Sequence, residues 1–147
     1  KIHRDIRGFS SDVPLLLNML IMIDDFTIEN GATLLLGKSH LKNEIPTDEY
    51  FKEHAIKATG KGGTIMIWNS NLFHASGFNS TDEVRRAIPI TFSLPYYKQL
   101  LDYPRAIGYE KYDSFNPEMK KILGYDSRIS STVSDWYSPI EKLLYKK

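Results

Sequence analysis

The sequence predicts a mainly β fold, either a sandwich or a jelly-roll barrel. Over residues 1–93, short apolar and β-branched runs have the length of strands and are separated by turns rich in Gly, Asn, Asp and Ser. A single short helical pattern interrupts them, at residues 47–54. Many strands with one small helix among them are typical of two-sheet sandwiches and jelly-roll barrels.

The apolar runs and the turns between them place the strands. The longest run, residues 15–23, is apolar on both faces, as expected of a strand buried on both sides. A buried helix has the same pattern, but the short length of the run and the preceding Pro14 favour a strand. In chain order the predicted strands are residues 1–6, 15–23, 32–36, 64–68, 72–77 and 84–92.

Asn18 is the one polar residue inside the run 15–23. A buried amide needs hydrogen-bond partners. We therefore expect Asn18 either to fix the local structure or to face a cavity, and the sequence leaves both interpretations open.

Two turns punctuate the predicted strands. The pair Asn30-Gly31 is a strong hairpin signal, so residues 32–36 are expected to return beside residues 15–23. The second turn, Gly60-Lys61-Gly62-Gly63, lacks the spacing of a phosphate-binding loop and precedes no helical pattern. We interpret it as another hairpin connection.

Helices are expected in three places. Residues 47–54 have Thr47 as a candidate N-cap, with two acidic residues in the first turn. The segment 94–147 is rich in Pro and Tyr and has helical patterns at residues 117–123 and 139–146. We expect a single domain over residues 1–147, with core strands at about 1–93 and a tail at 94–147.

Composition excludes several classes of function. The 147 residues are 41% hydrophobic and 25% charged, with a net charge of +1, so no strong field attracts nucleic acid or an anionic membrane. No apolar run has the length of a transmembrane helix. The absence of cysteine excludes disulfides and thiolate metal sites and is compatible with a cytoplasmic location, which we expect.

The first candidate site is the sequence His3-Arg4-Asp5. In a strand, His3 and Asp5 point to the same face. With a second histidine they would form a set of two His and one carboxylate, the ligand set of non-haem Fe(II) oxygenases. By itself the pattern is common, and a polar strand face on the surface is the alternative interpretation.

The second histidine is expected to be His74. It lies in an otherwise apolar strand and is flanked by small residues, so it should face inward. A histidine in that position is either a hydrogen-bonded core residue or a metal ligand, and the strand pattern is compatible with both.

Arg85 is the candidate anion-binding residue. Along residues 84–92 it shares a strand face with small side chains, which leaves room for a ligand beside the guanidinium. Guanidinium groups bind carboxylates through two parallel hydrogen bonds. Two solvated arginines at the start of a strand explain the pattern equally well. Ser76 would share the face of His74 if that strand continues, and would add a hydroxyl donor.

The order of several motifs resembles the phytanoyl-CoA dioxygenase family of Fe(II)- and 2-oxoglutarate-dependent oxygenases. The matching segments are His3-Arg4-Asp5, residues 25–33, Ser39-His40, residues 63–68, residues 74–79, residues 85–88 and residues 122–125. They occur in family order over nearly the whole chain.

The resemblance implies a double-stranded β-helix, the jelly-roll architecture of cupin-like barrels. It implies that His3, Asp5 and His74 bind Fe(II), and that Arg85 pairs with the distal carboxylate of 2-oxoglutarate. Ser76 matches a position near this cosubstrate. Asn18 lies on a strand that supplies another cosubstrate contact in the family.

Two departures from the family pattern bear on these expectations. Gly37-Lys38 precedes Ser39-His40, where the family usually has Pro-Gly. Family members also have a substantial N-terminal part before His-x-Asp, which carries barrel strands and some contacts to cosubstrate and substrate. We therefore expect this sequence to be a C-terminal fragment.

The expected function is hydroxylation of a small-molecule substrate with Fe(II), 2-oxoglutarate and O2, releasing succinate and CO2. Asp5 favours hydroxylation over halogenation, because related halogenases need a free position for chloride where this carboxylate would bind. Two alternatives remain: another metal-dependent jelly-roll enzyme, such as a cupin-like isomerase or zinc hydrolase, and a catalytically inactive jelly-roll binding module. The sequence specifies neither the substrate nor the oligomeric state.

Overall fold

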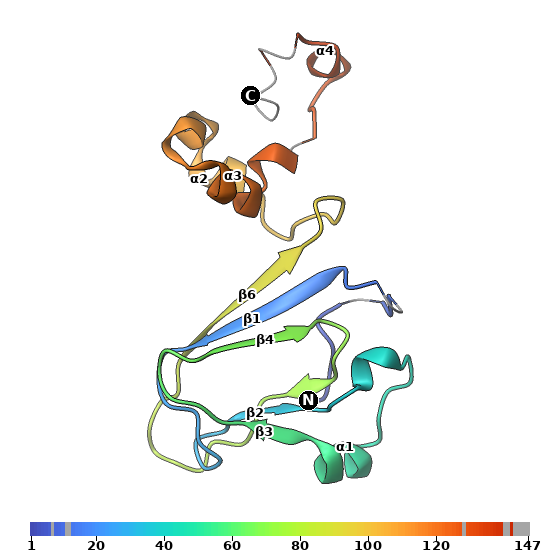
Figure 1. Ribbon diagram of the computed structural model, residues 1–147, viewed down its shortest axis with the longest axis vertical. Helices are drawn as coiled ribbons and strands as arrows, with labels where there is room; N and C mark the ends of the chain where they lie inside the picture. Colours follow the sequence, from blue (N-terminus) through green and yellow to red (C-terminus); the bar gives the residue numbers. More distant parts are fainter. Residues whose placement is uncertain (7, 11–12, 128, 140–141, 143–147) are drawn as a thin grey trace. The chain divides into compact units, whose positions relative to one another are not determined.

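A computed structural model describes residues 1–6, 8–10, 13–127, 129–139 and 142 (Figure 1). The chain divides into two compact units, Lys1–Phe92 and Ser93–Lys147. Six strands lie among the described residues, all but the last residue of β6 within the first unit, whereas α2, α3 and α4 lie in the second. The chain as a whole is therefore mixed α and β, and the mainly β prediction describes its first unit.

The first sheet has the strand order β4-β1-β6. Its central strand, β1 (Leu16–Met22), pairs antiparallel with β4 (Ile65–Asn69), and β6 (Ala87–Ser93) lies along its other side. The predicted strand at residues 15–23 is confirmed. Its buried residues Asn18 and Met22 share a face, because side chains alternate along a strand.

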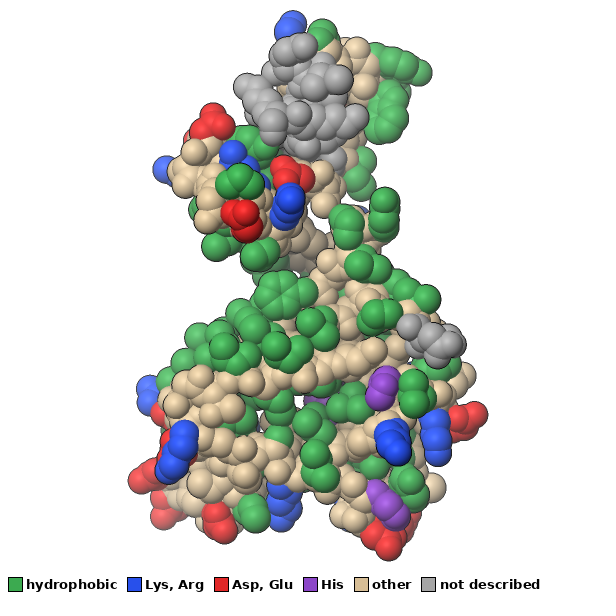
Figure 2. All heavy atoms as spheres, in the orientation of Figure 1, with side chains coloured by type: hydrophobic (Ala, Val, Ile, Leu, Met, Phe, Trp, Pro, Cys, Tyr) green, Lys and Arg blue, Asp and Glu red, His purple; other side chains and the backbone are tan. Residues whose placement is uncertain are grey.

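The opposite face of this sheet is apolar and exposed. Figure 2 shows hydrophobic side chains gathered over β1 and β6. Exposed members of this face are Leu17, Ile65, Ile67 and Ile88. Both faces of β1 are apolar, but among the described residues only one of them is buried.

The second sheet has the strand order β3-β2-β5 and is made of short strands. Its members are β2 (Thr33–Leu35), β3 (Ile56–Ala58) and β5 (His74–Ala75). Both β3 and β5 pair antiparallel with β2. The predicted strand at residues 72–77 is thus reduced to two residues, and β3 was not predicted.

The two predicted hairpins are wrong. β1 and β2, which flank Asn30-Gly31, belong to different sheets, and so do β3 and β4, which flank the glycine-rich turn. Asn30 closes its own loop, accepting from the Thr27 backbone N–H at 2.8 Å and donating to the Asp25 carbonyl at 2.7 Å. Asn30-Gly31 therefore forms the expected turn, but the strand that follows it belongs to the other sheet.

Two clusters of buried apolar side chains form the core of the first unit. Burial of each large side chain contributes about 1.5–3 kcal/mol to folding. One cluster contains Leu36, Phe51, Phe73 and Ala75, and the other contains Met22, Phe26 and Ala32, with Leu20, Met66 and Ala87 packed against it. Because Leu20, Met22, Met66 and Ala87 meet in one cluster, the inner faces of β1, β4 and β6 point to the same side.

The helix predicted at residues 47–54 is confirmed as α1 (Asp48–His54). The Thr47 side chain accepts from the Tyr50 backbone N–H at 3.2 Å, as expected of an N-cap. Phe51 is the buried residue of α1 and ties it to the core. A short 3-10 helix, η1 (Ser39–Leu41), precedes it.

The second unit is built from short helices. The helix predicted at residues 117–123 is confirmed as α3 (Pro117–Leu123), capped by Asn116, whereas the pattern at 139–146 falls almost wholly outside the described residues. The other elements are α2 (Tyr103–Ile107), η2 (Tyr109–Ser114), η3 (Tyr125–Ser127) and α4 (Val133–Trp136). Among the described helices, none has the length and apolar character needed to cross a membrane.

Candidate metal centre

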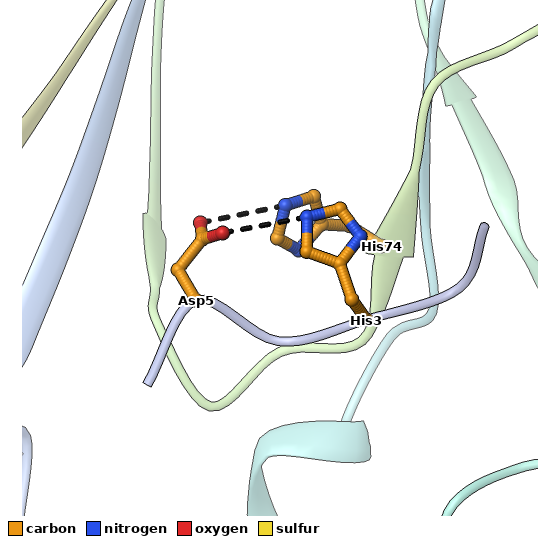
Figure 3. Close-up of side chains that lie close together, drawn as sticks. All are labelled: His3, Asp5 and His74. Atoms are coloured by element: carbon orange, nitrogen blue, oxygen red, sulfur yellow. Dashed lines mark ion pairs between the residues drawn. The ribbon is translucent and has the colours of Figure 1, made fainter. Parts of the chain in front are cut away.

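His3, Asp5 and His74 converge on one point, as the sequence predicted (Figure 3). The Nε2 atom of His3 lies 3.4 Å from Oδ1 of Asp5, and Nε2 of His74 lies 3.4 Å from Oδ2. One ligand atom from each of the three residues lies within 4.8 Å of the others. The three side chains could therefore share one metal ion.

Backbone pairing holds the two histidines side by side. The His3 N–H donates to the His74 carbonyl at 3.0 Å, and the His74 N–H donates to the His3 carbonyl at 2.9 Å. Farther along, the Asp5 N–H donates to the Ser70 carbonyl at 3.2 Å. Since β5 also pairs with β2, His74 is fixed by backbone bonds on both sides.

Hydrogen bonds fix the tautomer of both imidazoles. Nδ1 of His3 lies 3.0 Å from the Lys1 carbonyl oxygen, and Nδ1 of His74 lies 3.0 Å from the Leu72 carbonyl oxygen. A carbonyl can only accept, so each Nδ1 carries the proton and, in the neutral ring, each Nε2 presents a lone pair. This is how metal-binding histidines are commonly oriented.

The donor set fits a divalent cation. Two Nε2 lone pairs and a carboxylate that face one another repel unless positive charge lies between them. The two N–O distances of 3.4 Å are longer than the roughly 2.7–3.2 Å of a direct hydrogen bond. Ligands at right angles around an octahedral ion, with bonds of about 2.1 Å, lie about 3 Å apart. Two His and one carboxylate suit Fe(II), and they also suit Zn(II).

The group is buried on one side and open on the other. The side chain of His74 is 9% exposed, whereas those of His3 and Asp5 are 48% and 34% exposed. Within the described residues, a ligand can therefore reach the centre from the side of His3.

Asn18 supports the carboxylate. Its Nδ2 donates to Oδ2 of Asp5 at 2.5 Å, and its Oδ1 accepts from the Thr91 hydroxyl at 3.0 Å. The residue is only 3% exposed. The contacts show that the amide faces Asp5, and its predicted contact with the cosubstrate stays a prediction.

The two arginines differ in their partners. Arg86 is committed to Asp24, to which its Nε and a terminal nitrogen donate at 3.0 and 2.8 Å. Arg85 stacks on the buried ring of Phe26, with its guanidinium carbon 4.0 Å from the ring centroid. Partial burial lowers the pKa of Arg85 from its usual value. Among the described residues Arg85 has no ion pair, so its guanidinium remains available to an anion.

Ser76 was expected to share the face of His74 only if their strand continues, and the strand does not continue. β5 ends at Ala75, one residue earlier, and Ser76 is exposed. The strand therefore does not continue to place its hydroxyl on the face of His74.

Two supporting residues were missed in the sequence. The buried Ser39 hydroxyl donates to the Leu36 carbonyl at 2.7 Å and accepts from the Phe73 N–H at 2.8 Å, beside His74. Arg4 stacks over the ring of Phe73 at 4.0 Å and donates to the Lys42 carbonyl at 2.8 Å. The motif Ser39-His40 was a signal for the first, whereas no local pattern indicated the second.

Comparisons with known proteins agree with this geometry. An uncharacterized protein of Mycobacterium tuberculosis is 32% identical over 145 residues, covering 99% of this chain and 53% of that protein. The iron/alpha-ketoglutarate-dependent dioxygenase penM of Penicillium thymicola is 28% identical, over 91% of this chain and 45% of its own length. The chain thus spans about half the length of the curated relatives it matches.

The fold also matches solved structures. The crystal structure of EctD from S. alaskensis with bound Fe superimposes with a TM-score of 0.54 and 22% identity, over 65% of this chain and 38% of that one. At this identity the likeness concerns the fold. The profile of phytanoyl-CoA dioxygenase (PhyH) matches residues 1–87, more than half of the 147 residues. The chain therefore belongs to the phytanoyl-CoA dioxygenase (PhyH) family.

Proposed function

We propose that this chain carries the metal and cosubstrate site of an Fe(II)- and 2-oxoglutarate-dependent dioxygenase that hydroxylates a small organic molecule. The observation that carries the proposal is the convergence of two Nε2 lone pairs and a carboxylate from His3, His74 and Asp5. When bound, Fe(II) supplies the oxidative chemistry, in which 2-oxoglutarate, O2 and a C–H bond become succinate, CO2 and an alcohol.

The protein's part is to hold and orient. His3 and His74 keep Nε2 toward the metal because their Nδ1 protons are bound to carbonyl oxygens. Asp5 supplies the negative charge, and Asn18 fixes its carboxylate by a hydrogen bond. A ligand set of this kind leaves coordination positions open for cosubstrate and O2.

Arg85 is proposed to bind the distal carboxylate of 2-oxoglutarate. Of the two arginines that directly precede β6, Arg85 is the one without a carboxylate partner among the described residues, and its stacking on Phe26 holds the guanidinium in place. The inner face of β1 runs from Asn18, beside the metal ligands, to Met22, beside Phe26, an interval of about 13 Å. A cosubstrate bound to both the metal and Arg85 would lie along this face.

We also propose that the two sheets are the facing halves of a double-stranded β-helix. The short strand β5 brings His74 to the second sheet, while Asn18 of the first sheet reaches Asp5. A ligand site between the two sheets is the arrangement this architecture would provide, and the resemblance to EctD supports it.

Binding measurements test the proposal without relying on turnover of a chain that spans half of its relatives. Fe(II) affinity is measured by anaerobic calorimetry, and 2-oxoglutarate is then titrated into the metal-loaded protein. We expect His74→Ala to abolish metal binding, and the exposed His54→Ala to leave it unchanged as the matched control. We expect Arg85→Gln to weaken 2-oxoglutarate binding by at least about tenfold, and Arg86→Gln to leave it near the wild-type value.

Three outcomes separate the candidate functions. Metal binding with 2-oxoglutarate binding that depends on Arg85, followed by succinate release in O2, supports the dioxygenase. Metal binding that prefers Zn(II) and is indifferent to 2-oxoglutarate indicates another metal-dependent enzyme. Metal affinity that His74→Ala leaves unchanged rejects the site itself and leaves a binding module.

A further inference from the structure

Trp68 carries a buried hydrogen-bond donor that the protein leaves unused. Its indole Nε1–H is buried and has no hydrogen-bond partner among the described residues. Buried indole N–H groups usually find an acceptor, and an unsatisfied buried donor is unfavourable. An unsatisfied donor next to a functional site therefore points to an acceptor that arrives with a ligand.

The indole lies beside the metal-ligand group. Trp68 on β4 is directly opposite Asn18 on β1, so the two side chains share the inner face of the sheet. Its ring meets the imidazole of His74 edge to face, with centroids 5.4 Å apart and planes at 67°. The indole thus contacts one proposed metal ligand and faces the residue that supports another.

Two acceptors of these neighbours hold hydrogen bonds from donors other than the indole. Oδ1 of Asn18 accepts from the Thr91 hydroxyl, and Oδ2 of Asp5 accepts from Asn18. Nε2 of His74 faces Asp5. None of these acceptors makes a hydrogen bond with the indole N–H, which therefore remains available to an oxygen from outside the described residues.

We propose that the Trp68 indole N–H donates a hydrogen bond to an oxygen of the ligand held at the metal centre and so positions that ligand. The inference rests on the proposed function. Two oxygen acceptors are chemically suitable, a metal-bound water and a carboxylate of 2-oxoglutarate. Trp68 is thereby a positioning residue for the cosubstrate in addition to Arg85.

The indole proton itself is the reporter. The chain has two tryptophans, so its 15N–1H spectrum contains two indole signals, and Trp136→Phe assigns them. Zn(II) serves as a diamagnetic probe in place of Fe(II), and 2-oxoglutarate is added second. We expect the Trp68 signal to move downfield in one of the two steps and the Trp136 signal to stay. Movement with Zn(II) alone identifies the metal-bound water, and movement with 2-oxoglutarate identifies the carboxylate.

A substitution gives an independent measurement. Trp68→Phe keeps an aromatic ring near His74 and removes the donor together with the second ring of the indole. We expect it to weaken 2-oxoglutarate binding about tenfold, as one hydrogen bond to a charged acceptor would, with Zn(II) affinity changed less than about twofold. If the acceptor is the water alone, the loss appears instead in Zn(II) affinity. Trp136→Phe, an exposed position in the second unit, is the control and should change neither.

The outcomes keep this inference separate from the proposed function. If Zn(II) and 2-oxoglutarate bind but the Trp68 signal stays in place, the positioning role is refuted and the dioxygenase proposal survives. The same conclusion follows if Trp68→Phe binds both as the wild type does, since the N–H would then point only at the imidazole ring. If no metal binds, both proposals fail together.

Discussion

Replacement of Asn18 by leucine tests whether the amide acts on the metal ligand or on the cosubstrate. The substitution removes the hydrogen bond to Asp5 and the acceptor of Thr91 while filling a site that is 3% exposed. Loss of a residue that holds a metal ligand typically costs about 10–100-fold in metal affinity. Because the Asp5 side chain is 34% exposed, water can replace part of the lost bond, and we expect the lower end, about tenfold.

The effect on folding is expected to differ. Leucine has the branched shape of asparagine and the same number of side-chain heavy atoms, and it suits the apolar face of β1, while the exposed Thr91 can bind water instead. The free energy of unfolding should therefore change by less than about 1 kcal/mol, the size of one ordinary hydrogen bond. Zn(II) calorimetry without cosubstrate measures the first effect, and urea unfolding of the metal-free protein measures the second.

Two controls bracket the result. Thr91→Val removes only the hydrogen bond from Thr91 to Asn18. It should lower metal affinity about twofold, because Asn18 keeps its hydrogen bond to Asp5. Leu17→Ala, on the exposed face of β1, should not change it. A variant Asn18→Leu that binds Zn(II) like the wild type but has lost affinity for 2-oxoglutarate would refute this reasoning and favour the cosubstrate contact.

Three further changes probe the frame around the site. Ser39→Ala leaves the buried N–H of Phe73 without its acceptor, so we expect a loss of about 1–3 kcal/mol in urea unfolding. Gly77→Ala would place a methyl group against the backbone carbonyl oxygen of Ala32, and we expect a lower melting temperature by circular dichroism. Hydrogen bonds from Arg86 lower the pKa of Asp24 from 3.8 to about 2. This pair therefore stabilises the fold above pH 3.8, and the stabilisation is lost as the pH falls through about 2. Arg86→Ala should flatten the pH dependence of the free energy of unfolding over that range.

Each of these has a contrary result. Ser39→Ala with wild-type stability would mean that a water replaces the hydroxyl. Gly77→Ala with an unchanged melting temperature would mean that the segments after β5 and before β2 can move apart at that point. An unfolding curve at pH 2–4 that is the same with and without Arg86 would show that the ion pair with Asp24 does not contribute to stability.

The convergence of His3, Asp5 and His74 could be predicted because short local patterns in the sequence indicate each residue. The strand predicted at residues 1–6 is wrong, because the structure has only an isolated bridge at His3, yet His3 and Asp5 still point to one place. The apolar setting of His74 indicated an inward side chain, and His74 is buried. Arg85 was distinguished from Arg86 by the small residues on its face, and the contacts agree, since Arg86 is the one paired with Asp24.

Strand pairing could not be predicted, because a turn motif specifies a reversal and not a partner. Asn30-Gly31 forms the expected turn, but β2 pairs with β3 and β5. The partner depends on which apolar faces meet, and those contacts join residues far apart in the sequence. For the same reason nothing near Trp68 or Thr91 in the sequence indicated that both lie beside Asn18.

The segment that carries His3 and Asp5 has a consequence for the rate at which metal would leave. Two of the three proposed ligands lie on it, and among the described residues its backbone hydrogen bonds to the rest of the unit are those to His74 and Ser70. A single local opening that breaks these bonds would withdraw two ligands at once, so metal exchange would follow the opening of this segment and not stepwise ligand loss. Hydrogen exchange at the amides of His3 and Asp5 should then slow when metal binds, by a factor that tracks the metal's residence time.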